Sequence, residues 1–172
     1  MSAGARILEV SPDQALLLDA VARGETDAVA RLQRELALAP PQLSAEVLSV
    51  KRVPAGSGVS YGHTFVTPTE TTLALVAMGY GDGLPRKAGN RASVAWHGDA
   101  GVKLLPIVGR VAMNAFVVDA GDLVVCAGDR VVLFGDPSRG ELSIDEWAAS
   151  VGETALSIVS SLDARVTRSV RS

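Results

Sequence analysis

The sequence predicts a mainly β protein: an antiparallel β-barrel-like domain with a short helical segment at its N-terminus and helices near its C-terminus. From residue 43 on, six short runs of aliphatic and β-branched residues are separated by glycine-rich segments. Short strands at such spacings are typical of an antiparallel barrel or sandwich. The predicted strands are residues 44–53, 71–78, 92–98, 102–109, 110–120 and 129–135.

Residues 1–41 are predicted to form a helical arm, and residues 42–172 the β domain. A first helix is expected after Ser11, because Pro12 suits the first helical position and Gln14 completes a capping box. A second helix with one apolar face follows, and it ends before the two prolines that close the arm.

Two short helices are predicted near the C-terminus. Ser143 and Glu146 form a second capping box, and Gly152 ends the helix that it begins. Residues 155–162 form the next helix, and an extended segment follows. Three arginines lie in this last segment and are predicted to carry exposed or interface charge: Arg165, Arg168 and Arg171.

The composition argues against several classes of function. The chain is 48% hydrophobic, which is enough to bury a core. It has 16 Lys and Arg against 19 Asp and Glu and only 4% aromatic residues, so no nucleic-acid partner is expected. No apolar run approaches the roughly 18 residues of a membrane helix, and acidic residues interrupt the position of a signal peptide. We therefore expect a cytoplasmic protein without a membrane partner.

The lone cysteine and the two histidines do not indicate a metal site. Cys126 lies in an apolar run and is predicted to be a small buried residue of a strand rather than a nucleophile. His63 and His97 stand apart in the sequence, and surface or turn positions are predicted for both.

Two motifs place polar side chains where predicted strands end. The segment GYGDG at residues 79–83 displays Tyr80, and its glycines permit a close approach of backbone or ligand. The segment IVGRVAMN at residues 107–114 ends in Met113 and Asn114. An asparagine amide can donate to a carboxylate or complete a turn. Each motif alone is more typical of a turn than of a site.

Four segments taken in order, VKRVPAGSGVSYGHTF, VAMGYGDGLPR, LPIVGRVAMN and DARVTR, resemble the C-terminal domain of alanine racemases over residues 43–170. The resemblance implies a β-rich domain that accompanies an N-terminal barrel, in which a lysine holds pyridoxal phosphate. It also implies head-to-tail dimers whose active sites take their second half from the partner chain. By the same resemblance, Tyr80 is an acid/base residue, and Met113 and Asn114 lie beside the substrate carboxylate.

The chain departs from the racemase pattern in several places. About 40 residues precede the β domain, whereas such a barrel needs on the order of 200. Asn114 stands where the family usually has aspartate, and Ala164 stands where some racemases have a tyrosine against the cofactor phosphate. No cofactor-binding residue is expected here, because no lysine matches the family's Schiff-base motif. The three lysines are Lys51, Lys87 and Lys103.

Two hypotheses follow from the sequence. In the first, the chain supplies Tyr80 and the carboxylate contacts to a pyridoxal phosphate racemase that interconverts L- and D-alanine, and it is inactive alone. A separate barrel protein, or the rest of a longer enzyme, then completes the site. In the second, the chain is a stand-alone binding or assembly module that retains the racemase fold without the reaction. Apolar surface around Tyr80 and Met113 predicts a homo-oligomer, unless the helical arm covers that surface.

Overall fold

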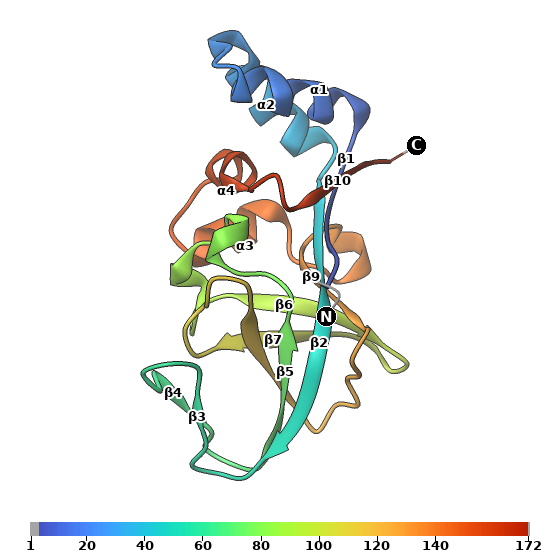
Figure 1. Cartoon of the computed structure of the whole chain (residues 1–172). Helices are drawn as coiled ribbons and strands as arrows, with labels where there is room; N and C mark the ends of the chain where they lie inside the picture. The colour runs from blue at the N-terminus through green and yellow to red at the C-terminus, as the bar shows by residue number, and fades with distance from the viewer. Residues whose placement is uncertain (1–3, 172) are drawn as a thin grey trace.

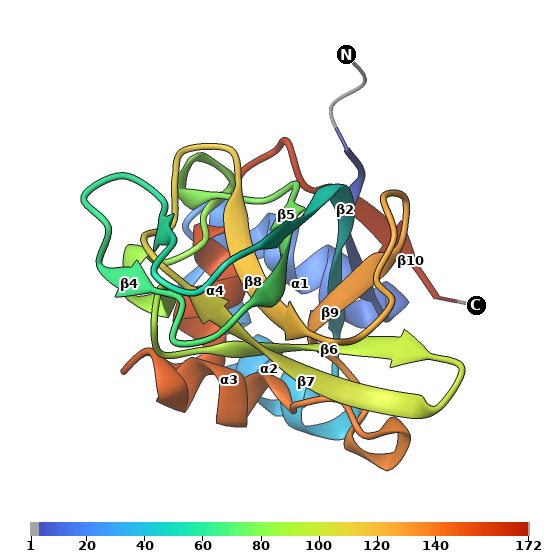
Figure 2. The same cartoon turned by 90° about the horizontal axis from the view of Figure 1, so that it is seen from below.

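The computed structural model describes residues 4–171. Within them, six strands close into an antiparallel barrel, and two more strands join the sheet beside the first strand of the barrel (Figure 1). The view from below looks across the closed ring of strands (Figure 2). The predicted mainly β, barrel-like fold is confirmed. In spatial order the barrel strands are β2 (Gln42–Val53), β5 (Thr71–Val76), β8 (Phe116–Gly121), β7 (Gly101–Val108), β6 (Ser93–Gly98) and β9 (Arg130–Phe134), and β2 also pairs with β9.

Strand β2 closes the barrel because it is long enough to pair with different neighbours along its length. Residues 43–46 pair antiparallel with β9. From Val47 on, β2 pairs antiparallel with β5, with an irregularity in this pairing between Val47 and Ser49. Leu43, Ala45 and Val47 are fully buried, so alternate side chains of this half pack into the core. The apolar alternation therefore fixes the register of β2 against both neighbours.

A strand at the N-terminus was not predicted from the sequence. Strand β1 (Arg6–Val10) pairs antiparallel with the first half of β2 and parallel with β10 (Thr167–Val170). Leu8 and Val10 are fully buried, so one face of this short strand joins the core. Five residues are too few to show a clear alternation in the sequence, and the strong helix signal at Ser11 dominates the segment. The division of the chain near residue 41 stays a prediction.

The predicted N-terminal helices are present as α1 (Pro12–Ala22) and α2 (Thr26–Leu38). Ser11 and Gln14 form the expected capping box of α1. Gln14 is fully buried and also donates hydrogen bonds to the backbone oxygens of Glu35 and Ala39 at the end of α2. The side chain of this one glutamine thus forms hydrogen bonds with backbone groups at the start of α1 and at the end of α2.

The remaining elements connect the strands; the helices among them cover one end of the barrel, and the β3–β4 hairpin lies toward the other end (Figure 1). Helix α3 begins at the predicted capping box of Ser143 and Glu146. Helices α3 and α4 lie between the barrel and the α1–α2 hairpin (Figure 1). These elements are β3 (Gly58–Val59), β4 (Phe65–Val66), the 3₁₀ helices η1 (Tyr80–Asp82), η2 (Arg86–Ala88) and η3 (Pro137–Arg139), and the helices α3 (Ile144–Ser150) and α4 (Ala155–Ser161).

The prediction for Cys126 was wrong. Its thiol is exposed, and the segment between β8 and β9 that contains it is a loop rather than a strand. The Cys126 amide donates instead to the side chain of Asp129, a local turn bond that competes with strand pairing. None of the helices in residues 4–171 is long and apolar enough to cross a membrane.

The buried amide of Gln14 predicts a measurable loss of stability on substitution. Gln14→Met keeps the side-chain length but leaves the backbone oxygens of Glu35 and Ala39 without this donor. We expect a decrease of about 1–3 kcal/mol in the free energy of unfolding, measured by urea denaturation. Gln33→Met, on the exposed face of α2, is the matched control and should change stability little. Equal losses in the two variants would contradict the role of Gln14.

The capping box of α3 predicts a specific pH dependence. The Ser143 amide, and then its hydroxyl, donate hydrogen bonds to the Glu146 carboxylate and lower the pKa of Glu146 below its ordinary value of 4.5. A carboxylate with a lowered pKa stabilises the folded state above its unfolded-state pKa, and this contribution is lost as the pH falls through the folded-state pKa. The difference in unfolding free energy between wild type and Glu146→Gln should therefore shrink on acidification. A difference that is independent of pH would contradict this account.

Candidate functional site

The GYGDG motif forms a tight turn directly after β5. Tyr80 begins the 3₁₀ helix η1, and the turn closes at Gly83, whose φ of +96° favours glycine. The carboxylate of Asp82 accepts a hydrogen bond of 2.8 Å from the Gly79 amide. Tyr80 is 38% exposed, and Cζ of the Arg86 guanidinium lies 4.2 Å from the centroid of its ring. This cation–π contact fixes one face of the ring at the surface.

The second motif lies directly against this turn. Met113 and Asn114 are in the loop between β7 and β8, so they follow one strand and precede the next. The Tyr80 amide donates to the Ala112 oxygen at 3.0 Å, and the Gly81 amide donates to the Met113 oxygen at 2.8 Å. The structure therefore brings together the three residues that the sequence singled out, Tyr80, Met113 and Asn114.

Arg165 joins this cluster, although the sequence predicted only exposed or interface charge for it. Its guanidinium donates to the Asn114 side-chain oxygen at 3.2 Å and lies 3.5 Å from Asp82 Oδ1. Arg165 also contacts Asp163 at 3.3 Å. Because arginine can only donate, the Asn114 oxygen faces Arg165, and the amide nitrogen is left as a donor on the other side. The DARVTR segment of the sequence carried the only signal for this residue.

The buried carboxylate of Asp82 contacts both the Tyr80 turn and Arg165. Asp82 is fully buried, and its Oδ1 atom lies 2.8 Å from Nε of Arg6 on β1. The N–H of Arg6 does not point at this oxygen, so the contact is an ion pair without a hydrogen bond. No sequence pattern connects Arg6 with Tyr80, because the two are far apart in the chain and Arg6 belongs to a strand that was not predicted.

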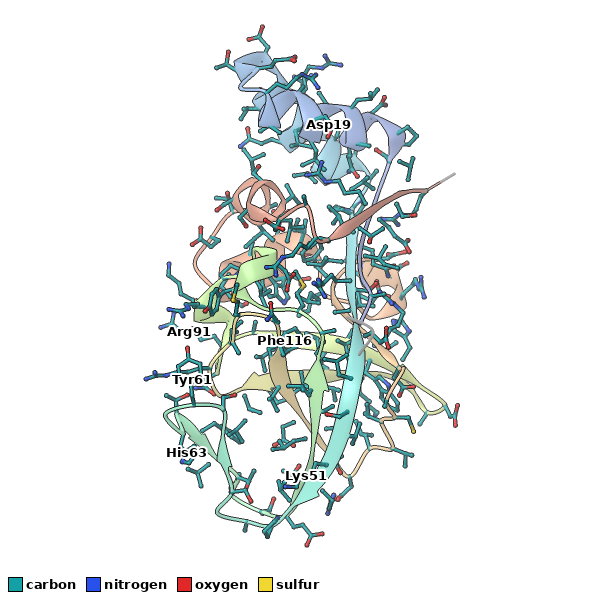
Figure 3. All side chains as sticks on the ribbon, in the orientation of Figure 1. Asp19, Lys51, Tyr61, His63, Arg91 and Phe116 are labelled. Atoms are coloured by element: carbon teal, nitrogen blue, oxygen red, sulfur yellow. The ribbon has the colours of Figure 1, made fainter. Side chains whose placement is uncertain are left out.

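The two histidines lie outside this cluster. His63 and Tyr61 belong to the hairpin of β3 and β4 (Figure 3). Cζ of the Arg110 guanidinium lies 5.2 Å from the centroid of the Tyr61 ring. His97 is the last residue but one of β6, and its Nε2 atom lies 2.8 Å from the buried carboxylate of Glu141. Both histidines are exposed, as the surface prediction has it, and His97 in addition pairs with a buried acid.

The lysines do not form a cofactor site with Tyr80. Lys51 is on the second half of β2, near the end of the barrel that points away from the helices (Figure 3). Lys103 is on the exposed side of β7, and the Lys87 ammonium pairs with Glu153 at 3.4 Å. None of these amines is directed to the cluster of Tyr80, Met113 and Asn114. The residues present therefore do not fit pyridoxal phosphate held as a Schiff base by this chain.

Comparison with known proteins identifies the family. The family model "Alanine racemase, C-terminal domain" matches residues 41–170. This chain belongs to that family. The alanine racemase of Frankia casuarinae is 49% identical over 126 residues, which are 73% of this chain and 32% of that protein. The alanine racemase of Streptomyces coelicolor is 45% identical over 126 residues, 73% of this chain and 31% of that protein.

Solved alanine racemases share the fold of this racemase-family domain. The enzyme of the D-cycloserine producer Streptomyces lavendulae superimposes with a TM-score of 0.71 at 45% identity, over 77% of this chain and 34% of that one. The Bartonella henselae enzyme, with covalently bound pyridoxal phosphate, gives a TM-score of 0.68 at 32% identity, over 76% and 35% of the two chains. The chain thus spans about one third of the length of the relatives that it matches.

The close approach of the two motifs predicts a strong steric effect at Gly79. A Cβ atom at this position would lie 2.3 Å from the Ala112 oxygen and 2.4 Å from the Met113 carbonyl carbon. Gly79→Ala should therefore separate the motifs and lower the free energy of unfolding by about 3 kcal/mol. Gly152→Ala is the control, because its site is open and carries only the cost of a φ of +70°. If Gly79→Ala costs no more than the control in urea denaturation, the close packing of the motifs is wrong.

Proposed function

We propose that this chain supplies the acid/base tyrosine and the carboxylate-binding groups of an alanine racemase active site. Tyr80, Met113 and Asn114 share one exposed surface, and backbone hydrogen bonds join the loops that carry them. This juxtaposition is the observation that supports the proposal, together with membership of the racemase family. The barrel and the lysine for pyridoxal phosphate come from another polypeptide or segment, and residues 1–172 are inactive without them. The cytoplasmic location expected from the sequence is part of this proposal.

The surface suits an amino-acid substrate. Racemisation requires an acid/base group on each face of Cα, and Tyr80 offers one hydroxyl for one face. The Asn114 amide nitrogen can donate to the substrate carboxylate, and its neighbour Arg165 adds positive charge. An aspartate at position 114 would bring a second negative charge to the carboxylate, whereas asparagine does not. The second acid/base group and the cofactor belong to the missing barrel.

The exposed surface also supports a protein partner. Tyr80 and Met113 are 38% and 52% exposed, so the α1–α2 hairpin does not cover them, and one of the two options left open by the sequence is removed. A barrel domain, in the same or a partner subunit, would cover this surface when it completes the site. A second copy of this chain is the alternative occupant.

A non-catalytic binding or assembly module is the second candidate. Asn114 and Ala164 replace an aspartate and a tyrosine expected from the resemblance, and none of the three lysines matches the family's Schiff-base motif. These changes remove or alter contacts to substrate and cofactor without affecting the barrel fold. The experiment that tests the proposed function must therefore distinguish a domain that contributes to catalysis from one that keeps only the racemase fold.

A chimera provides this test. Glu9 on β1 pairs with Gln42 on β2, so the ends of the segment between these strands are adjacent, and a domain can be inserted there. The barrel of the Streptomyces coelicolor alanine racemase replaces residues 11–41, and alanine racemisation is measured with pyridoxal phosphate. We expect activity above the cofactor background, and a loss of about 10²- to 10⁴-fold in Tyr80→Phe.

The control is Tyr61→Phe, which likewise removes a tyrosine hydroxyl, but from the β3–β4 hairpin, and should leave the rate unchanged. Equal rates in the Tyr80→Phe and parent chimeras would remove Tyr80 from the reaction. A folded chimera without activity would favour the non-catalytic module. Residues 1–172 alone should exchange the Cα hydrogen of L-alanine in heavy water no faster than free pyridoxal phosphate does.

A further inference from the structure

The carboxylate beneath Tyr80 is held by two arginines from opposite ends of the chain. Asp82 is fully buried; its Oδ2 accepts from the Gly79 amide, and its Oδ1 faces Arg6 at 2.8 Å and Arg165 at 3.5 Å. A buried carboxylate loses its hydration and therefore needs charge partners inside the protein. Both partners lie on one oxygen, and the other oxygen shapes the turn that presents Tyr80.

Arg6 is the better placed of the two partners. Its side chain is 12% exposed, whereas that of Arg165 is 39% exposed, so water screens the Arg6 charge less. Arg165 also divides its contacts among Asp82, Asp163 and Asn114. The neutralisation of Asp82 therefore depends chiefly on β1.

The backbone fixes Arg6 relative to the Tyr80 turn. Glu46 on β2 donates its amide to the Ala5 oxygen at 3.0 Å, and its own oxygen accepts from the Ala77 amide at 2.8 Å. Its carboxylate also accepts from the Ala5 amide at 2.9 Å. Glu46 thus joins the start of β1 to the segment between β5 and η1. Gly4 packs so closely that an added Cβ would lie 2.6 Å from the Ala77 Cβ.

We infer that Arg6 is a positioning residue for Tyr80, which acts through the Asp82 carboxylate. Its guanidinium compensates the buried charge, and the charged carboxylate then holds the Gly79 amide at the start of the Tyr80 turn. The consequence of this inference for catalysis rests on the proposed function of Tyr80, whereas the coupling between Arg6 and the Tyr80 turn can be tested without cofactor or partner. Strand β1 lies outside residues 41–170, so the N-terminal segment becomes a working part of the racemase surface.

Amide hydrogen exchange of the whole chain, followed by NMR, tests this coupling. In Arg6→Met the side chain keeps its apolar stem and loses its charge. We expect the Gly79 amide to exchange at least about tenfold faster than in wild type, while the Val118 amide in β8 keeps its rate. General destabilisation would accelerate both amides, so the ratio of the two rates separates positioning from a merely structural role.

The matched control is Arg168→Met on β10. Arg168 pairs with the exposed Asp19 at 3.0 Å and does not contact Asp82, so both amides should keep their wild-type rates. In an Asp82→Asn background, Arg6→Met should change the Gly79 rate by less than about twofold, because the group through which Arg6 acts is neutral. If Arg6→Met does not fold, Arg6→Gln removes the same charge with a polar end group, and a Gly79-specific acceleration of several-fold is expected.

Three results would overturn the inference: an unchanged Gly79 rate in both Arg6 variants, parallel acceleration of Gly79 and Val118, or an equal effect of Arg6→Met with and without the Asp82 carboxylate. None of these depends on racemase activity. An inactive chimera with a Gly79-specific response would refute the proposed function and retain the positioning role. An active chimera without that response would support the proposed function and refute the positioning role of Arg6.

Discussion

The pairing of β2 with three neighbours is the constraint on which the rest of the structure depends. Its first half lies between β1 and β9, and its second half pairs with β5. Closure of the barrel through β9 removes the open edge that the sheet would otherwise expose. The same strand sets where β5 ends, and hence where the chain turns into Gly79 and Tyr80. The site loops are therefore placed by backbone hydrogen bonds of the sheet rather than by their own contacts alone.

Charge compensation complements this backbone constraint. Asp82 shapes the Tyr80 turn with one oxygen and requires cations at the other. One cation comes from β1 and the other from the segment that precedes β10, and these two strands pair with each other. The two ends of the chain consequently meet beside the candidate site. A short strand that could be regarded as an appendage contributes to the geometry of the surface that a racemase would use.

The surface offers part of what amino-acid racemisation requires. It presents a tyrosine, an asparagine and an arginine on adjacent loops. A tyrosine hydroxyl suits proton transfer at Cα, and an amide and a guanidinium suit the binding of a carboxylate. Its lysines are elsewhere, and one is paired with Glu153. The matched relatives are about three times as long as the aligned part of this chain, and they carry the family's name as whole proteins. In the proposed function, a barrel domain supplies what this domain lacks.

The sequence by itself determined the local features of this protein. The capping boxes at Ser11 and Ser143, the barrel strands and the ordered motifs around Tyr80 and Asn114 all depend on residues close together in the chain, so they could be predicted. Only the tertiary structure decided which distant groups meet. Arg6 and Arg165 reach Asp82 because β1 pairs with β2 and β10, and no local pattern encodes such long-range pairing. Cys126 is the local exception: its amide donates to the side chain of Asp129, three residues on, and this turn bond outweighs the apolar character of its neighbours, so the cysteine lies in an exposed loop.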